Sequence, residues 1–138
     1  MRRPLIFLSA CSCLLAVSTA CAPEKYRDSD PFDQPPAAAL AAVLDALESE
    51  RFDPTAISPD RRHVEAAQIS MSPSHLESFR LKATIRIETL PEGTVVRLCV
   101  ERELNTNILA PGDARTADWG RGEPDDETAE LLLYRIRE

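Results

Sequence analysis

The stretch RLKATIRIETLPEGTVVRLCVEREL, residues 80–104, predicts a β-hairpin. Both halves alternate apolar and polar side chains, the period of two of a strand with one buried face. The apolar rows are Leu81, Ala83, Ile85 and Ile87 in the first half and Val96, Leu98 and Val100 in the second. Between the halves, Pro91 presets φ and Gly93 accepts a positive φ, which is the chemistry of a turn. The apolar face needs cover from other elements.

The opposite face of this hairpin is predicted to be wet. Its residues are Arg86, Glu88, Val95, Arg97, Cys99, Glu101 and Glu103. Their charges have both signs, so cross-strand pairs can form on this face.

Two amphipathic segments flank the hairpin and predict helices that cover its apolar face. In residues 36–51, Leu40, Val43, Leu44 and Leu47 fall at i, i+3, i+4 and i+7, and Pro36 suits a first turn. Residues 124–138 begin with Pro124, and the acidic residues 125–127 that follow favour a helix N-terminus. The stripe of this segment is Ala129, Leu132, Leu133 and Ile136.

Between these elements the pattern is less regular. Residues 52–62 contain two prolines and are expected to be a loop, whereas residues 63–72 alternate and allow a further strand. Residues 73–78 form a connector, and residues 105–123 form a long loop with Trp119 and three of the four glycines. The expected fold is α+β, in the order α-β-β-β-α, with a small antiparallel sheet packed against two helices.

The start of the chain predicts export. Arg2 and Arg3 precede thirteen uncharged residues, 5–17, and the small residues Ser18, Thr19 and Ala20 follow. This is the layout of a secretory signal peptide over residues 1–20. The nineteen uncharged residues 4–22 would span about 28 Å as a helix, so an uncleaved membrane anchor is the alternative.

Ser18-Thr19-Ala20-Cys21 resembles the lipobox of bacterial lipoprotein precursors, in which the cysteine is acylated and becomes the mature N-terminus. Ser18 stands where that family usually has Leu. The resemblance implies lipidation at Cys21 and attachment to a membrane of the cell envelope. Ordinary signal peptidase would cut the same Ala20–Cys21 bond and release a periplasmic protein.

The mature chain is expected to divide into a tether, residues 21–36, which is acidic and rich in proline, and one α+β domain, residues 37–138. Loss of Arg2 and Arg3 with the signal takes the net charge from −7 to −9. This balance argues against a nucleic-acid partner. Only Cys21 and Cys99 remain after cleavage, with no metal-binding spacing, so neither a disulfide framework, a metal site nor a cofactor is expected.

Candidate catalytic groups are sparse. Glu101 and Glu103 share one strand face, as a glycosidase pair could, and Ser74 lies beside His75 in sequence. A salt-bridged sheet face and solvated side chains are the commoner outcomes, and the same holds for His63. Carboxylates at 125–127 could bind a hard cation, but they lack the spacing of a calcium loop and suit the helix dipole.

Trp119 and Cys99 each allow two roles. Trp119, between Asp118 and Gly120, is a possible binding anchor or a plug over the sheet edge. Cys99 could be a reactive thiol on the wet face, or inert if that face is covered.

The sequence as a whole favours a non-enzymatic envelope protein, lipid-anchored through Cys21, that binds another envelope component. In fold and export signal it resembles small envelope lipoproteins such as the lipopolysaccharide-assembly lipoprotein. A small exported hydrolase and a periplasmic protein that binds an apolar ligand are the alternatives.

Overall fold

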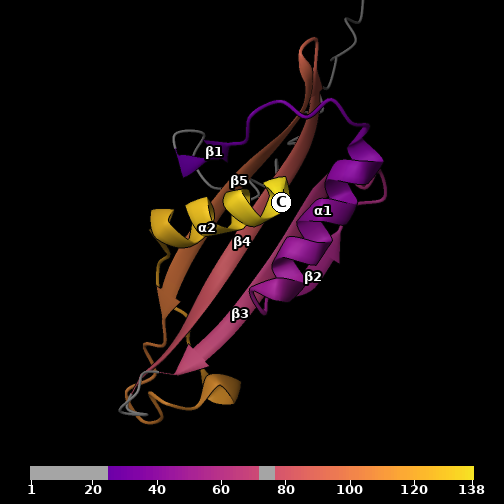
Figure 1. Cartoon of the computed structure of the whole chain (residues 1–138). Coiled ribbons are helices and arrows are strands. Elements are labelled where there is room, and N and C mark those ends of the chain that lie inside the picture. The colour runs from indigo at the N-terminus through magenta and orange to yellow at the C-terminus, as the bar shows by residue number, and fades with distance from the viewer. Residues whose placement is uncertain (1–24, 72–76) are drawn as a thin grey trace, which may run out of the picture.

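The computed structural model describes residues 25–71 and 77–138. This part of the chain forms one six-stranded antiparallel sheet with two helices on one of its faces (Figure 1). The elements in chain order are β1 (Arg27–Asp28), α1 (Pro36–Ser49), β2 (Asp53–Ile57), β3 (His63–Met71), β4 (Ser78–Leu90), β5 (Gly93–Leu104), the 3-10 turn η2 (Ala114–Thr116), β6 (Glu123–Pro124) and α2 (Asp126–Arg137). The strand order is β1-β5-β4-β3-β2, and β6 also pairs with β5.

The predicted hairpin is confirmed and is the centre of the sheet. Its register pairs Ile85 with Leu98 and Ile87 with Val96, so the two apolar rows share one face. Both rows are almost fully buried. Gly93 has a φ of +139°, a conformation that side-chain-bearing residues rarely adopt, and it closes the turn as predicted.

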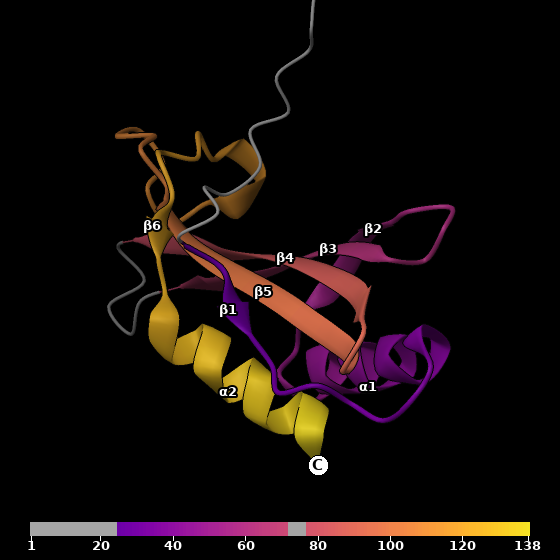
Figure 2. The same cartoon turned by 90° about the horizontal axis from the view of Figure 1, so that it is seen from above.

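The two predicted helices are confirmed and cover this apolar face. Figure 2 shows α1 and α2 on the same side of the sheet. The stripe expected of α2 is buried in full, and that of α1 is buried except for Leu44, which is only partly buried. Asp125 caps α2 by accepting a hydrogen bond from the Thr128 amide at 3.0 Å. In the described part of the chain, neither helix is long and apolar enough to cross a membrane.

The α+β class is confirmed, but the order α-β-β-β-α is incomplete. Residues 53–57, expected to lie in a loop, form the edge strand β2, and β1 and β6 are two further strands. All five residues of β2 are exposed, so the strand has no apolar row that periodicity could reveal. β1 and β6 have two residues each, which is too short to show an alternation of apolar and polar residues. The strand expected within residues 63–72 is confirmed as β3.

The predicted tether is wrong for the part that the structure describes. Arg27 pairs with Leu98, the Ser29 amide donates to the Val96 carbonyl at 2.8 Å, and Phe32 pairs with Thr94. The folded region therefore includes residues that were expected to precede it, and does not begin at residue 37. A polar segment can be part of the fold in this way, because backbone hydrogen bonds to β5 require no apolar side chains.

The outer edge of β5 is covered along most of its length by short segments. Beyond β1, the Asp125 amide donates to the Val100 carbonyl at 2.9 Å, and β6 pairs with residues 101–102. At the end of the strand, Asn105 pairs with Trp119. Such cover removes unpaired backbone groups from a long edge, which would otherwise invite aggregation.

The face predicted to be wet is partly buried. Val95, Thr84 and Cys99 point away from the helices, yet their exposure is only 4%, 6% and 0%. The register that pairs Arg27 with Leu98 brings Tyr26 opposite Cys99, and the Arg86 guanidinium lies 5.1 Å from the centre of the Tyr26 ring. The N-terminal segment thus covers this part of the sheet, and the buried Cys99 fits the inert role.

Candidate functional site

The carboxylates considered as a catalytic pair are each engaged by a different base. The Lys25 ammonium lies 3.1 Å from Glu101 Oε1, and Arg80 Nε donates to Glu103 Oε2 at 2.6 Å. Their side chains are only 19% and 13% exposed. This arrangement is the salt-bridged sheet face expected as the commoner outcome.

The other predicted polar candidates do not come together with these carboxylates. His63 lies at the start of β3, with Nε2 3.4 Å from Glu65 Oε1. Ser74, His75 and Cys21 lie outside the described residues, so their roles stay predictions.

The acidic start of α2 is engaged in helix capping and ion pairs. Besides the cap formed by Asp125, Asp126 Oδ2 lies 2.9 Å from an Arg27 nitrogen, and their hydrogen bond and charge raise the pKa of Arg27. Within residues 25–71 and 77–138, no group of three or more His, Cys, Asp and Glu side chains could hold a metal ion.

A dense set of hydrogen bonds holds residues 105–122 against the end of the sheet, and Asn105 is at its centre. Its Nδ2 lies 3.1 Å from Ser78 Oγ, 3.1 Å from the Ala110 carbonyl and 3.0 Å from the Pro111 carbonyl. Its Oδ1 accepts from the amides of Asn107 and Asp118 at 3.0 and 3.1 Å. One side chain therefore joins the start of β4 to both sides of the loop.

The loop has further supports on each side of Asn105. Ser78, which is fully buried, donates from both its amide and its hydroxyl to the Pro111 carbonyl, at 2.8 and 3.0 Å. Asp113 accepts hydrogen bonds from the backbone and side chain of Arg115, and these bonds lower the pKa of Asp113. These polar contacts thus fix the loop against the end of the sheet.

Trp119 lies half-buried over the outer face of the sheet at this end. The Arg80 guanidinium stands 5.0 Å from the centre of its ring, in cation–π geometry, while also binding Glu103. This placement is that of a plug over the sheet edge. Binding by the exposed part of the ring stays a prediction.

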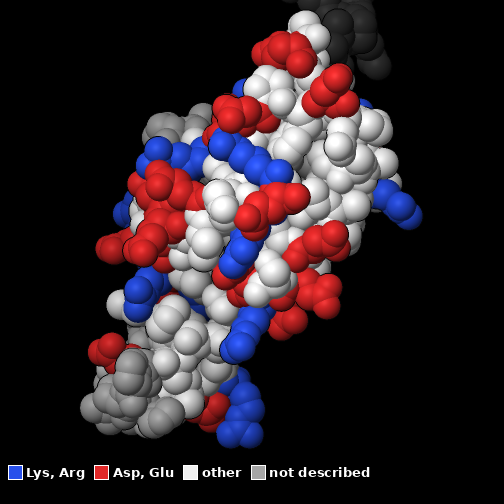
Figure 3. Space-filling model, in the orientation of Figure 1, with Lys and Arg blue, Asp and Glu red and all other residues white. Residues whose placement is uncertain are grey.

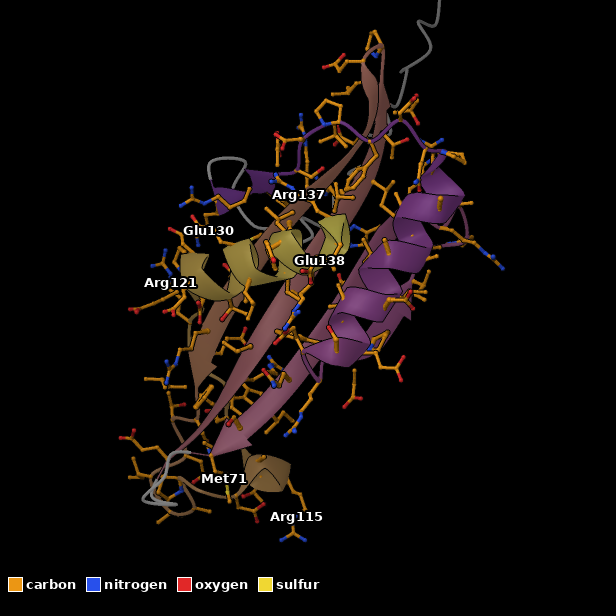
Figure 4. The ribbon with its side chains drawn as sticks, viewed as in Figure 1. Met71, Arg115, Arg121, Glu130, Arg137 and Glu138 are labelled. Carbon is orange, nitrogen blue, oxygen red and sulfur yellow. The ribbon has the colours of Figure 1, made fainter. Side chains whose placement is uncertain are left out.

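Exposed apolar side chains gather where β3 ends, β4 begins and β5 ends. The register aligns Ser70, Phe79 and Leu104 across these strands. Five of the eight exposed large hydrophobic residues of the described chain lie here, and we call this group the loop end: Ile69 (55% exposed), Met71 (47%), Leu104 (51%), Ile108 (90%) and Leu109 (91%). Figure 4 shows Met71 and Arg115 at this same end of the molecule.

Ile108 and Leu109 form the tip of this group. The tip lies in a tight turn, closed by a hydrogen bond of 3.2 Å from the Ala110 amide to the Asn107 carbonyl. Sequence reasoning marked the loop as unusual but did not predict that its two aliphatic residues would be almost fully exposed. The available signal was an adjacent Ile-Leu pair in an otherwise polar loop.

Two hollows differ in what they could bind. A pocket of about 170 Å³ lies under the loop and is lined in part by Leu104 and Ile108. A wider hollow of about 530 Å³ lies between β1 and α2. Its lining combines charged residues, among them Arg27, Glu130 and Arg137, with Tyr26, Leu133 and Tyr134. Figure 3 shows acidic and basic side chains interspersed over the helix face. Mixed charge makes the wider hollow unsuited to an apolar ligand.

No protein-family model matches this chain, and no curated protein matches it.

Proposed function

We propose that this protein is an exported, lipid-anchored envelope protein that acts as a non-enzymatic binding or assembly module, with the loop end as its binding surface. The observation that carries the proposal is the exposure of Ile108 and Leu109, at 90% and 91%, on a loop fixed by Asn105. The lipobox-like Ser18-Thr19-Ala20-Cys21 supports the anchor.

Exposure of this kind is costly unless a partner covers it. Burying an aliphatic side chain stabilises by about 1.5 to 3 kcal/mol, and here two adjacent side chains leave that energy unused. A flexible loop could fold back onto the sheet and bury Ile108 and Leu109. The hydrogen bonds of Asn105 and Ser78 hold the loop in place and so keep the tip presented. Exposed apolar groups on a fixed loop are typical of binding surfaces.

The hydrolase alternative receives less support from the geometry. General acid–base work by two carboxylates needs both groups to face one substrate. Glu101 and Glu103 are instead held by Lys25 and Arg80.

The lipid anchor is tested by metabolic labelling with an alkyne fatty acid. The wild-type chain should take up label, and Cys21→Ala should not. Label that persists in Cys21→Ala, or that is missing from the wild type, would overturn the anchor.

The binding surface is tested separately by a photo-crosslinking amino acid placed at Ile108 in cells. Adducts should form from this position, whereas the same group at Glu92, in the turn at the far end of the hairpin, should form few. Equal yields at the two positions would contradict a binding role for the loop end.

A further inference from the structure

We infer that the partner of the loop end is the membrane surface itself, with Ile108 and Leu109 inserted into the bilayer that holds the acyl chains of Cys21. The inference rests on the proposed lipid anchor and deepens it, because it assigns the domain an orientation. A lipoprotein on a long tether would have no fixed orientation.

Cys21 is close in sequence to the described part of the fold. Lys25 is held by its contact with Glu101, and Arg27 by pairing with Leu98 and by the ion pair with Asp126. Only three residues, 22–24, separate Cys21 from Lys25, which makes four steps along the chain. At most about 3.6 Å per residue gives a reach of roughly 14 Å. An acylated Cys21 would bring this part of the domain to the membrane surface.

Lys25 lies towards the end of β5 that leads into the loop. Lys25 contacts Glu101, which precedes Leu104 by three residues, or about 10 Å along the strand. β6, which pairs with residues 101–102, follows the loop directly. Figure 2 shows this loop rising on the side of the sheet away from both helices. Lys25 and the tip thus both lie towards the C-terminal end of β5.

The chemistry of the tip suits a lipid surface. Two adjacent aliphatic side chains project beyond a polar loop, and the Arg115 side chain, 89% exposed, stands nearby in the same loop. Aliphatic groups suit the boundary between headgroups and acyl chains, and a long cationic side chain can extend towards the headgroups. Because the mature chain is acidic, insertion should depend on apolar burial and be insensitive to salt.

A lipid surface fits this tip better than a protein partner does. A stable protein interface buries about 800 Å² on each side, far more than two side chains supply. Insertion next to an existing anchor needs little affinity of its own, because the anchor already holds the tip at high effective concentration.

The test uses the full lipidated chain in phosphatidylcholine vesicles, with the environment-sensitive dye NBD attached to Ile108→Cys. Cys99 is fully buried and Cys21 is acylated, so the new thiol is the one open to labelling in the folded protein. The matched control carries the dye at Glu92→Cys, about 37 Å away along β5. At position 108 we expect the NBD emission to shift to the blue and most of its fluorescence to be quenched by spin-labelled lipids. Both effects should be unchanged in high salt. Neither should occur at position 92.

A second variant separates insertion from mere proximity. With the dye at Leu109→Cys, the added change Ile108→Asp should abolish lipid quenching while the fatty-acid label persists. Equal quenching at positions 108 and 92, or quenching that Ile108→Asp leaves intact, would overturn the inference. A blue shift in native membranes without quenching by lipid would assign the tip to a protein partner and would also overturn it. If the fatty-acid label itself is missing, the proposed anchor fails, and this inference fails with it.

Discussion

Replacing Asn105 by alanine should release the loop formed by residues 105–122 while leaving the sheet folded. An asparagine amide has two N–H donors, and its carbonyl oxygen can accept two bonds, so the side chain makes at most four full hydrogen bonds. The structure provides partners for all four. Nδ2 has three acceptors within reach for its two N–H groups, on Ser78, Ala110 and Pro111. Oδ1 accepts one hydrogen bond each from the amides of Asn107 and Asp118.

The size of the effect follows from these bonds. Each contributes about 0.5 to 1.5 kcal/mol net, which gives about 2 to 6 kcal/mol for the set. Asn105 is only half-buried, and water can replace part of what is lost, so we expect the lower half of this range, about 2 to 4 kcal/mol. Opening of the loop should then become about 30- to 700-fold more frequent.

Native-state hydrogen exchange measures this opening directly. The Thr106 amide, bonded to Asp118, and the Gly120 amide, bonded to Leu104, should lose protection by this factor. Amides of Ile85 and Leu98, at the centre of the sheet, should keep theirs because the hairpin does not depend on the loop. Unchanged protection at Thr106 and Gly120 would refute the assignment of Asn105 as the anchor of the loop.

Two matched variants sharpen the result. Asn107→Ala loses only two exposed hydrogen bonds, to Thr116 and Leu109, and should cost about 1 kcal/mol or less. Asn105→Asp puts a carboxylate against the carbonyl oxygens of Ala110 and Pro111, so it should open the loop at least as much as alanine at neutral pH. Protonation of that carboxylate in acid should restore part of the protection. An aspartate that behaves like wild type would contradict the predicted donor role of Nδ2.

Three further predictions address the sheet and the loop. Ile85→Ala removes three buried carbons and leaves a cavity, so urea unfolding should show that the free energy of unfolding falls by about 2 to 5 kcal/mol. Lys82→Ala, on the opposite face, should change it by no more than roughly 0.5 to 1 kcal/mol. Equal unfolding midpoints for the two variants would contradict the register. Gly93→Ala should lower the melting temperature, because φ is +139° and the new methyl carbon would lie 2.6 Å from a backbone oxygen. Hydrogen bonds from Arg115 lower the pKa of Asp113. The contribution of Asp113 to loop stability is therefore present above the ordinary aspartate pKa of about 3.9, and it is lost as the pH falls through the lower folded-state pKa. An NMR titration that shows an ordinary pKa for Asp113 in the wild type would refute this.

The elements that the sequence predicted well are those whose own residues carry a period. In β4 and β5 the period of two separates the buried row around Ile85 from the charged row, and in α2 the stripe through Leu132 and Leu133 selects the buried face. Each pattern extends over a dozen residues, so local sequence was enough. The turn at Gly93 and the helix start at Asp125 were predictable for a different reason. Few residue types adopt the positive φ of Gly93, and few side chains can accept a hydrogen bond from the first amides of a helix as Asp125 does.

The candidate site was only partly predictable. The long loop and Trp119 were singled out from composition, but the exposure of Ile108 and the role of Asn105 were not. An asparagine after a strand has no local feature that reveals contacts with Ser78, 27 residues earlier in the chain. Exposure is also a property of what lies nearby in space, and a pair of aliphatic residues in sequence does not record it.

By itself, then, the sequence determined the hairpin, the two covering helices and the α+β class, because periodicity over many residues leaves one way to bury each apolar face. Only the tertiary structure decided how the edges are closed. β1 and β6 have two residues each and gain their order from backbone bonds to β5, and β2 buries none of its residues. Such pairing depends on the geometry of the partner strand and cannot be predicted from the short segments alone. It makes part of the expected tether a strand of the sheet, and it brings Lys25 towards the same end of β5 as the exposed tip of the loop.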